Sequence, residues 1–381
     1  MHHAIRSIAA ACLLAGCGEG AESSPDSPLA GKVDAIFADV SDARPGCAAG
    51  VIDGESYIYA KGYGLANLEY GAPITPASVF RMGSVSKQFT AAAVAILAAR
   101  GEIELDADVH DYLPELADYG APVSIRQMIH HLSGMGDYET DANRFEVRPG
   151  VAFRFGNEDY WTVAEFYAEV AKQPLLHPPG QQWEYSNLAY FLLSQVVERV
   201  SGQTLQEFSA HEIFTPLGMN ESFFNDNVNQ VVKGRVSGYL ALEAGGYETY
   251  DTNLDFVCDG GVYTTLNDFL KWDQALRNDA LPDGVAAAMT APYPPARVED
   301  WERLAPGATY GYGLAIGDHN GEPVFTHTGH WVGFSTFYAR FPKRDVAAVV
   351  FCNGTDVEAP EKGWALADAA LAALSDPGAT R

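Results

Sequence analysis

The chain has 381 residues, more than one compact core usually holds, which predicts two closely packed lobes or two domains. Hydrophobic residues make up 47% of the sequence and charged residues 19%, a balance typical of a globular protein and not of a disordered one. The formal net charge is −26, whereas binding to phosphate backbones needs clustered Lys and Arg. This composition argues against nucleic acid as a partner.

The N-terminal stretch MHHAIRSIAAACLLAGC is typical of an export signal. Its apolar run, Ile8 to Ala15, is too short to span a bilayer but suits the hydrophobic region of a signal. The sequence Leu-Ala-Gly-Cys that ends at Cys17 resembles the lipobox of bacterial lipoproteins, in which the cysteine is lipidated. The alternative is an ordinary cleaved signal with an incidental cysteine. We expect an exported protein, periplasmic or at the cell surface and lipid-anchored to a bacterial membrane, organised as an export signal with lipobox (1–17), a polar tether (18–28) and a functional domain (29–381).

Three cysteines remain in the body of the chain: Cys47, Cys258 and Cys352. An odd number of scattered cysteines predicts no disulfide framework, although export permits one bridge. We interpret them mainly as small buried hydrophobic residues. No CxxC or HExxH spacing occurs, and the adjacent His130 and His131 lack a partner pattern for zinc. No metal or other cofactor is therefore expected.

The predicted elements alternate from β to α and back to β. Two β-rich runs within residues 46–64, separated by Asp53-Gly54, predict a hairpin. Helical spacing follows over these ranges: Gln88–Arg100, Ile125–His131, Tyr160–Lys172, Leu188–Ser201 and Leu266–Arg277. Three or four strands follow from Gly311, divided at 318–321, 329–333 and 343–345, and a last helix within 358–374 should pack on them. We predict an α+β fold: an antiparallel sheet built from N- and C-terminal strands, flanked by helices, with a largely helical inserted lobe.

The stretch FRMGSVSKQFTA places Ser84 and Lys87 one turn apart at the start of a predicted helix. The unpaired N–H groups and positive dipole of a helix N-terminus favour a serine alkoxide or an oxyanion. Lys87 projects from the same face, and a partly desolvated lysine with a lowered pKa can accept the serine proton. The alternative is that Ser84 only caps the helix and Lys87 is solvated.

Two further motifs carry polar chemistry. In PPGQQWEYSNLAY, Tyr185 and Asn187 precede another amphipathic helix. A phenol can relay a proton, and an Asn amide can donate to a substrate carbonyl and accept from a lysine. His327-Thr328-Gly329 lies on a predicted strand that can line a cleft and offer backbone N–H groups to an extended substrate. The structural alternatives are a core aromatic residue, a helix cap and an ordinary strand residue.

In this order, the three motifs resemble those of the serine β-lactamase and penicillin-binding protein superfamily. The Tyr-x-Asn form is similar to class C β-lactamases and their relatives, the D-Ala-D-Ala carboxypeptidases, D-aminopeptidases and β-lactamase-like esterases. The resemblance runs roughly from Leu29 to Leu374. It implies a β-lactamase-like domain with Ser84 as the acylated nucleophile and Lys87 and Tyr185 as the proton-transfer pair. It also implies substrate contacts by Asn187, His327, Thr328 and Gly329, and an oxyanion hole from the backbone N–H groups of Ser84 and His330.

One motif departs from the β-lactamases and carboxypeptidases, which usually carry Lys-Thr-Gly where this chain has His327-Thr328-Gly329. The resemblance associates the His form with aminopeptidase-like and esterase-like members. A neutral imidazole can hydrogen-bond the Tyr185 hydroxyl but offers no permanent charge to a substrate carboxylate.

We therefore expect an exported serine hydrolase that works through an acyl-enzyme on a small-molecule ester or amide, D-amino-acid peptides included. Its rate should show a pH limb near the pKa of His327, which is about 6.5 before any perturbation by the protein. The alternatives are a β-lactamase or D-Ala-D-Ala carboxypeptidase, and a non-catalytic module that binds cell-wall peptides. The sequence leaves the oligomeric state open.

Overall fold

The computed structural model describes residues 28–137, 146–148, 151–152, 161–254, 259–298, 301 and 303–374. The predicted export signal, Cys17, all but the last residue of the tether, and Cys258 lie outside the described residues. Within the described ranges, no helix combines the length and the apolar character that crossing a membrane requires.

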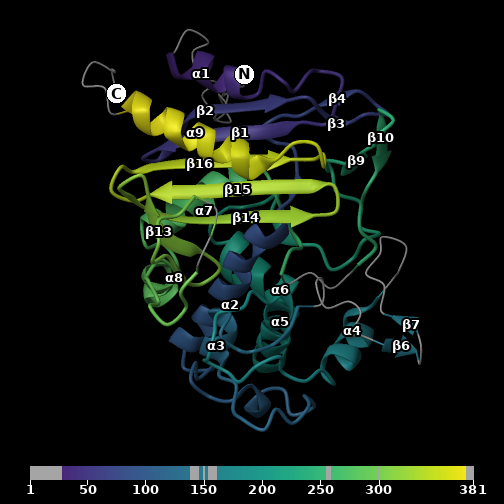
Figure 1. Ribbon diagram of the computed structural model, residues 1–381, viewed down its shortest axis with the longest axis vertical. Coiled ribbons are helices and arrows are strands. Elements are labelled where there is room, and N and C mark those ends of the chain that lie inside the picture. Colours follow the sequence, from purple (N-terminus) through teal and green to yellow (C-terminus); the bar gives the residue numbers. More distant parts are fainter. Residues whose placement is uncertain are drawn as a thin grey trace, which may run out of the picture.

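Among the described residues, a seven-stranded antiparallel sheet joins strands from both ends of the chain (Figure 1). The strand order is β12-β13-β14-β15-β16-β1-β2. This arrangement confirms the predicted α+β fold, and the predicted hairpin is β1–β2. The strands are β1 (Cys47–Asp53), β2 (Ser56–Tyr63), β12 (Thr309–Tyr310), β13 (Ala315–His319), β14 (Glu322–Trp331), β15 (Phe334–Phe341) and β16 (Val346–Cys352).

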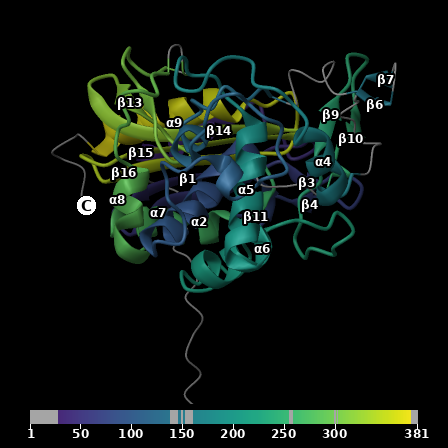
Figure 2. The ribbon, with the colours of Figure 1, turned by 90° about the horizontal axis from the view of Figure 1, so that it is seen from below.

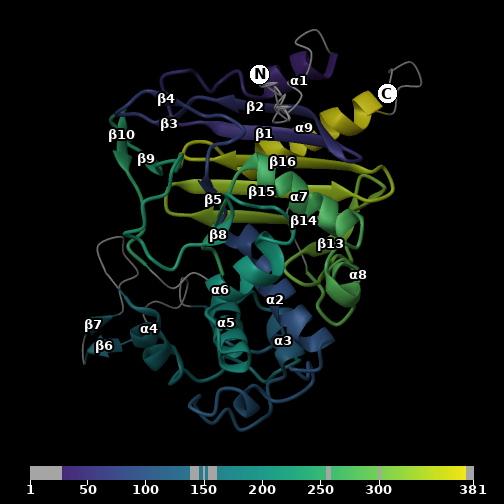
Figure 3. The same ribbon diagram turned by 180° about the vertical axis from the view of Figure 1, so that it is seen from behind.

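Successive side chains of the central strands point to opposite faces of the sheet, because side chains alternate along a β-strand. On β15, Phe337 and Ala339 pack on one face, whereas Tyr338 packs on the other. The first face is covered by α1 (Pro28–Ile36) and α9 (Ala359–Leu374), which lie side by side (Figure 1). The other face is covered by α7 (Leu266–Arg277) and by the helices of the inserted lobe, so the sheet lies between two helical layers (Figures 2 and 3).

The inserted lobe between β2 and β12 is largely helical and is centred on α2 (Lys87–Ala99). Every residue of α2 from Lys87 to Leu97 is buried, as expected for a helix that is apolar on all sides. It packs against α5 (Asn187–Ser201). The other helices described are α3 (Ile125–Ile129), α4 (Val163–Val170), α6 (Leu205–Ser209) and α8 (Val285–Met289). Short strands are β3 (Leu65–Asn67), β4 (Ala72–Pro73), β5 (Phe80–Arg81), β6 (Glu146–Arg148), β7 (Val151–Ala152), β8 (Phe223–Phe224), β9 (Tyr239–Ala241), β10 (Tyr247–Thr249) and β11 (Val262–Thr264).

The backbone conformation and the capping of single residues determine where the helices begin and end. Helix α3 ends two residues before its predicted end because His131 has a φ of 58°, outside the right-handed helical region. Helix α4 is shorter than predicted and begins after Thr162, whose side chain caps it. Helix α5 ends at Ser201 because the next residue, Gly202, has a left-handed φ of 71°. Pro28, which the sequence assigned to the tether, is the first residue of α1.

A disulfide joins Cys47 and Cys352, which lie directly opposite each other on β1 and β16. Both cysteines are buried, as interpreted from the sequence, and they form a bridge of the kind that export permits. The two positions are separated by 305 residues, and only the pairing of the N-terminal hairpin with the C-terminal strands brings them together. The bridge thus links the two ends of the domain.

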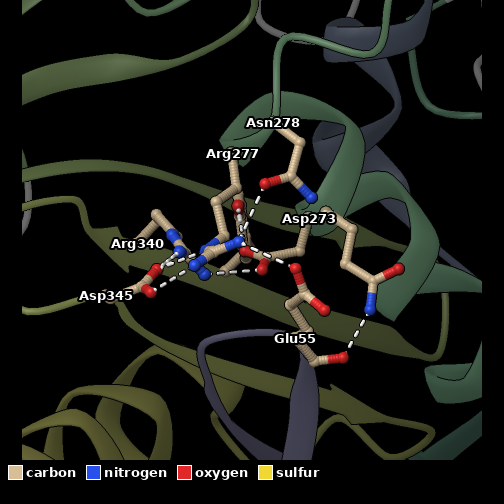
Figure 4. Close-up of polar contacts among 8 residues, drawn as sticks. Glu55, Asp273, Arg277, Asn278, Arg340 and Asp345 are labelled. Carbon is tan, nitrogen blue, oxygen red and sulfur yellow. Dashed lines mark hydrogen bonds and ion pairs between the residues drawn. The ribbon is translucent and has the colours of Figure 1, made fainter.

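An ion-pair network attaches α7 to the sheet (Figure 4). The buried Arg340 of β15 donates to the buried Asp273 of α7 at 2.6 Å, and the Tyr338 hydroxyl donates to Asp273 at 2.7 Å. Asp345 pairs with Arg340 and accepts two hydrogen bonds from Arg277, at 2.6 and 2.7 Å. Burial raises the pKa of Asp273 to about 6, against the opposing effect of Arg340.

Candidate active site

Ser84 lies in a 3₁₀ turn (η1, Gly83–Ser86) that leads directly into α2, so Lys87 is the first α-helical residue. Ser84 is therefore one turn before the α-helix and is not its cap. Gly83 has a φ of 51°, and a β-carbon there would lie 2.9 Å from the backbone nitrogen of His330. Glycine thus permits both the turn and its close approach to β14.

The side chain of Lys87 is fully buried, which excludes the alternative of a solvated first-turn residue. Its Nζ contacts Ser84 Oγ at 3.1 Å, Asn187 Oδ1 at 2.5 Å and the carbonyl oxygen of Asp259 at 3.0 Å. It also lies over the ring of Tyr185, 4.8 Å from the centroid.

The Asn187 and Asp259 oxygen atoms that Nζ contacts are carbonyl oxygens, which can only accept hydrogen bonds. A neutral Lys87 amine would use its two hydrogens for Asn187 and Asp259 and direct its lone pair at the hydroxyl of Ser84. The arrangement can therefore take a proton from that hydroxyl without any side chain moving.

Asn187 is held on its far side by Asp137. Its Nδ2 donates to both carboxylate oxygens, at 3.3 and 3.1 Å, and its backbone N–H donates to Asp137 Oδ2 at 3.3 Å. Because the amide hydrogens face the carboxylate, the amide oxygen faces Lys87. The helix is capped by Ser186, so Asn187 is not the N-cap.

His327 is nearly fully buried, with 1% of its surface exposed, and its two ring nitrogens have partners other than Tyr185. Nδ1 donates to the carbonyl oxygen of Thr328 at 2.5 Å, and Nε2 accepts from the Tyr310 hydroxyl at 2.8 Å. The expected hydrogen bond from His327 to Tyr185 is therefore wrong, because Tyr310 occupies that nitrogen. The ring centroids of Tyr185 and His327 lie 6.3 Å apart.

Burial, with a smaller effect of the nearby Lys87, lowers the pKa of His327 to about 3. The imidazole is therefore neutral throughout the neutral range. Burial thus shifts the limb expected from His327 far below its unperturbed position of about 6.5.

Strand β14 passes directly beside the serine turn. A β-carbon at Gly329 would lie 2.2 Å from the carbonyl oxygen of Met82 and 3.0 Å from the backbone nitrogen of Ser84. Thr336 of the adjacent strand donates to the same Met82 oxygen at 2.6 Å and fixes the turn to the sheet. The backbone nitrogens of Ser84 and His330 thus lie on neighbouring segments, an arrangement that can hold an oxyanion. Thr328 is buried in the same strand.

Four further residues complete this site and were not predicted from the sequence: His131, Asp137, Asp259 and Tyr310. Asp259 contributes a backbone oxygen, which has no side-chain signal. Asp137 lies in a loop and Tyr310 in a two-residue strand, so neither shows periodicity. His131 was noted only for lacking a zinc pattern, but its buried ring packs against Tyr185 with centroids 4.3 Å apart.

The fold and the site together define the class of the protein, the β-lactamase-related serine hydrolases. More specifically, the chain belongs to the Beta-lactamase family, whose profile matches residues 33–372. This match confirms the superfamily that the three sequence motifs indicated.

Similar proteins carry several activities in their names. The chain is 27% identical over 310 residues to penicillin-binding protein 4* of Bacillus subtilis (76% of this chain, 64% of that protein). It is 28% identical over 311 residues to a D-aminopeptidase of Gluconobacter oxydans (81% and 56%), and 36% identical over 204 residues to esterase EstB of Burkholderia gladioli (51% and 52%). The chain thus spans about half to two thirds of the length of these relatives.

Two solved structures have a similar fold. The octameric penicillin-binding protein homologue from Pyrococcus abyssi superposes with a TM-score of 0.76 at 24% identity, covering 90% of this chain and 76% of that one. The penicillin-binding protein from Bacillus halodurans superposes with a TM-score of 0.74 at 25% identity, covering 91% and 99%.

Proposed function

We propose that this protein is an exported serine hydrolase that cleaves an ester or small amide through an acyl-enzyme on Ser84. The observation that carries the proposal is the buried Nζ of Lys87, 3.1 Å from Ser84 Oγ, with two carbonyl oxygens as its other partners. Neutral Lys87 takes the hydroxyl proton as Ser84 Oγ bonds to the substrate carbonyl carbon. The N–H groups of Ser84 and His330 stabilise the oxyanion.

Collapse of the tetrahedral intermediate breaks the bond to the leaving group, which receives the proton through Tyr185. The position of the Tyr185 ring beside the Lys87 ammonium supports this transfer. Water then attacks the acyl-serine carbonyl and gives a proton to the same groups, which pass it to Ser84 Oγ as the bond to the acyl group breaks and the acid is released. Asn187 orients the substrate through its amide, and the strand segment from His327 to Gly329 lies beside the bound substrate.

The neutral His327 supports uncharged esters and amides as substrates, since it presents no fixed cation to a carboxylate. The similarity to esterase EstB and to D-aminopeptidases supports the same classes, D-amino-acid peptides included. A β-lactamase or D-Ala-D-Ala carboxypeptidase is the second candidate, favoured by the similarity to penicillin-binding protein 4*. A non-catalytic module for cell-wall peptides is disfavoured by the direct contact of Lys87 with Ser84.

We place the protein at a bacterial membrane, facing the periplasm or the cell surface, with a lipid on Cys17. The N-terminal sequence motivates this proposal, and the Cys47–Cys352 disulfide supports an oxidising compartment. Expression in a bacterial host with labelled palmitate should give a membrane-bound, labelled form, and Cys17→Ser should lose the label. A mature N-terminus sequenced elsewhere would overturn the lipid anchor but not export.

The acyl-enzyme is tested by a fluorophosphonate probe on the chain without residues 1–27. One label should be added, and Ser84→Ala should abolish it without loss of thermal stability. Lys87→Ala should slow labelling by about 10²–10⁴-fold, the usual effect of removing a positioned base. Equal labelling of Ser84→Ala would overturn the proposal. Turnover of p-nitrophenyl esters, D-aminoacyl anilides, nitrocefin and a D-Ala-D-Ala peptide then separates the substrate classes.

A further inference from the structure

His131 makes hydrogen bonds to the residues on both sides of Tyr185. Its carbonyl oxygen accepts from the backbone N–H of Glu184 at 2.9 Å, and its Nδ1 accepts from the backbone N–H of Ser186 at 3.1 Å. The ring of the same histidine packs against the Tyr185 ring with centroids 4.3 Å apart. One residue therefore fixes the backbone before and after Tyr185 and contacts its side chain.

The backbone of His131 is unusual for its residue type. Its φ of 58° lies in the left-handed region, which costs a non-glycine residue free energy and persists only where the surroundings impose it. The side chain is 0% exposed and is enclosed by the rings of Tyr185, Tyr190 and Tyr310, at centroid distances of 4.3, 5.1 and 4.4 Å. The ring orientation is thus fixed by packing.

The hydrogen bond to Ser186 determines the protonation of the imidazole. Because Nδ1 accepts a backbone hydrogen, the single ring hydrogen of the neutral form lies on Nε2. Burial, together with the nearby charge of Lys87, holds the pKa of His131 well below its usual range. The contacts of His131 with both neighbours of Tyr185 and with the Tyr185 ring give it a route to the reaction through Tyr185.

We propose that His131 is a positioning residue that keeps Tyr185 in place beside Lys87 by holding the N–H groups of Glu184 and Ser186. The proposal rests on the proposed function, which assigns proton transfer to Tyr185. Lys87 Nζ lies over the Tyr185 ring at 4.8 Å, and a proton passes efficiently only between groups at hydrogen-bond distance. A small displacement of the 184–186 backbone would therefore lower the rate of acylation more than it weakens substrate binding.

The test compares substitutions that keep or remove the side-chain acceptor. His131→Asn tolerates the left-handed backbone and places an oxygen near the position of Nδ1. His131→Gly tolerates the backbone but has no acceptor, and His131→Phe keeps the ring but has no acceptor. We expect His131→Asn to acylate close to the wild-type rate. The Gly and Phe variants should lose about tenfold or more in kcat, with little change in KM.

His130→Phe is the matched control. His130 is also buried, but its Nδ1 contacts the carbonyl oxygen of Tyr310 and not the 184–186 segment. Its substitution should lower the melting temperature and leave kcat of the folded protein unchanged. If the Asn variant is no faster than the Gly and Phe variants, His131 has no positioning role. If wild-type Ser84 is not labelled by the phosphonate probe, the proposed function itself fails, so the two failures are distinguishable.

Discussion

The Nζ of Lys87 lies 2.5 Å from the side-chain oxygen of Asn187, although the two residues are separated by 100 positions in the sequence. Lys87 begins α2 and Asn187 begins α5, so the contact joins the first turns of two packed helices. It fixes one of the Lys87 hydrogen bonds in a direction away from Ser84. The orientation of the Asn187 amide therefore affects how Lys87 meets the nucleophile.

Asp137→Asn should slow acylation, because it removes the charge that keeps the Asn187 amide hydrogens away from Lys87. In this variant the Asn187 side chain faces a second amide instead of a carboxylate, and its own amide can rotate. Its NH₂ group would then face Lys87 Nζ, so that two hydrogen-bond donors would oppose each other. A hydrogen bond to a charged group is worth about 1.5–3 kcal/mol, so we expect roughly a 10- to 100-fold lower acylation rate. The measurement is the rate of phosphonate labelling.

Asp268→Asn provides the control for this substitution. Asp268 is also buried, and it accepts hydrogen bonds from the backbone N–H of Glu221 and the hydroxyl of Ser222. It should lose stability without a change in labelling rate. Equal labelling rates in Asp137→Asn and the wild type would show that Asn187 needs no orientation by Asp137.

Local sequence patterns sufficed for the parts of the fold that rest on short-range signals. Alternating apolar residues around the Asp53-Gly54 turn predicted β1 and β2, and helical spacing predicted α7 to the residue. Ser84 and Lys87 could be identified because one helical turn holds both, and their contact at 3.1 Å follows from that spacing.

What depends on tertiary packing could not be predicted from these patterns. The partner of His327 is Tyr310, which approaches it through the pairing of β12 and β13 with β14. The disulfide needs the register of β1 against β16, and the Asp259 oxygen that contacts Lys87 belongs to the backbone. In each case a side chain or backbone atom gains its partner only through long-range contacts.

Removal of the disulfide should destabilise the domain and leave the chemistry intact. The bridge between Cys47 and Cys352 joins the two chain ends in the sheet. The double variant Cys47→Ala, Cys352→Ala removes this link and mainly increases the conformational freedom of the unfolded chain. We expect a loss of about 2–5 kcal/mol in the free energy of unfolding. A reductant should lower the melting temperature of the wild type but not that of the double variant. A wild type insensitive to reductant would argue against the bridge.

Asp273→Asn should destabilise the protein strongly, because it leaves the buried Arg340 with only part of its countercharge. Breaking one side of a buried ion pair typically costs about 3–5 kcal/mol. Glu169→Gln is the control, since its partner Lys172 is exposed and such a surface pair should contribute about 0–1 kcal/mol. Urea unfolding measures both values. Similar losses in the two variants would contradict the structural role of the α7 network.

Acid should destabilise the folded state between about pH 6 and pH 4.5, owing to three buried histidines. Burial lowers the pKa of His130 to about 4 and that of His327 to about 3, and lowers the pKa of His131 well below its usual range. The unfolded chain binds these protons near the ordinary pKa of about 6.5, whereas the folded chain does not. The three neutral histidines therefore make their full contribution to the free energy of unfolding above about pH 6.5, and this contribution is lost as the pH falls.

Asp273 acts in the opposite direction, because its raised pKa of about 6 lets the folded state take up a proton that the unfolded chain binds only near pH 3.8. Its contribution to stability therefore grows as the pH falls through this window. Burial also raises the pKa of Asp251, which therefore acts in the same direction as Asp273. Three histidines less these two carboxyls give a difference of about one to two protons near pH 5, or roughly 1.5–3 kcal/mol per pH unit. Urea unfolding at several pH values measures this slope. His130→Asn should reduce it by about one proton, and Asp273→Asn should increase it by about one. A free energy of unfolding that does not change between pH 6 and pH 4.5 would mean that these histidines are protonated in the folded protein.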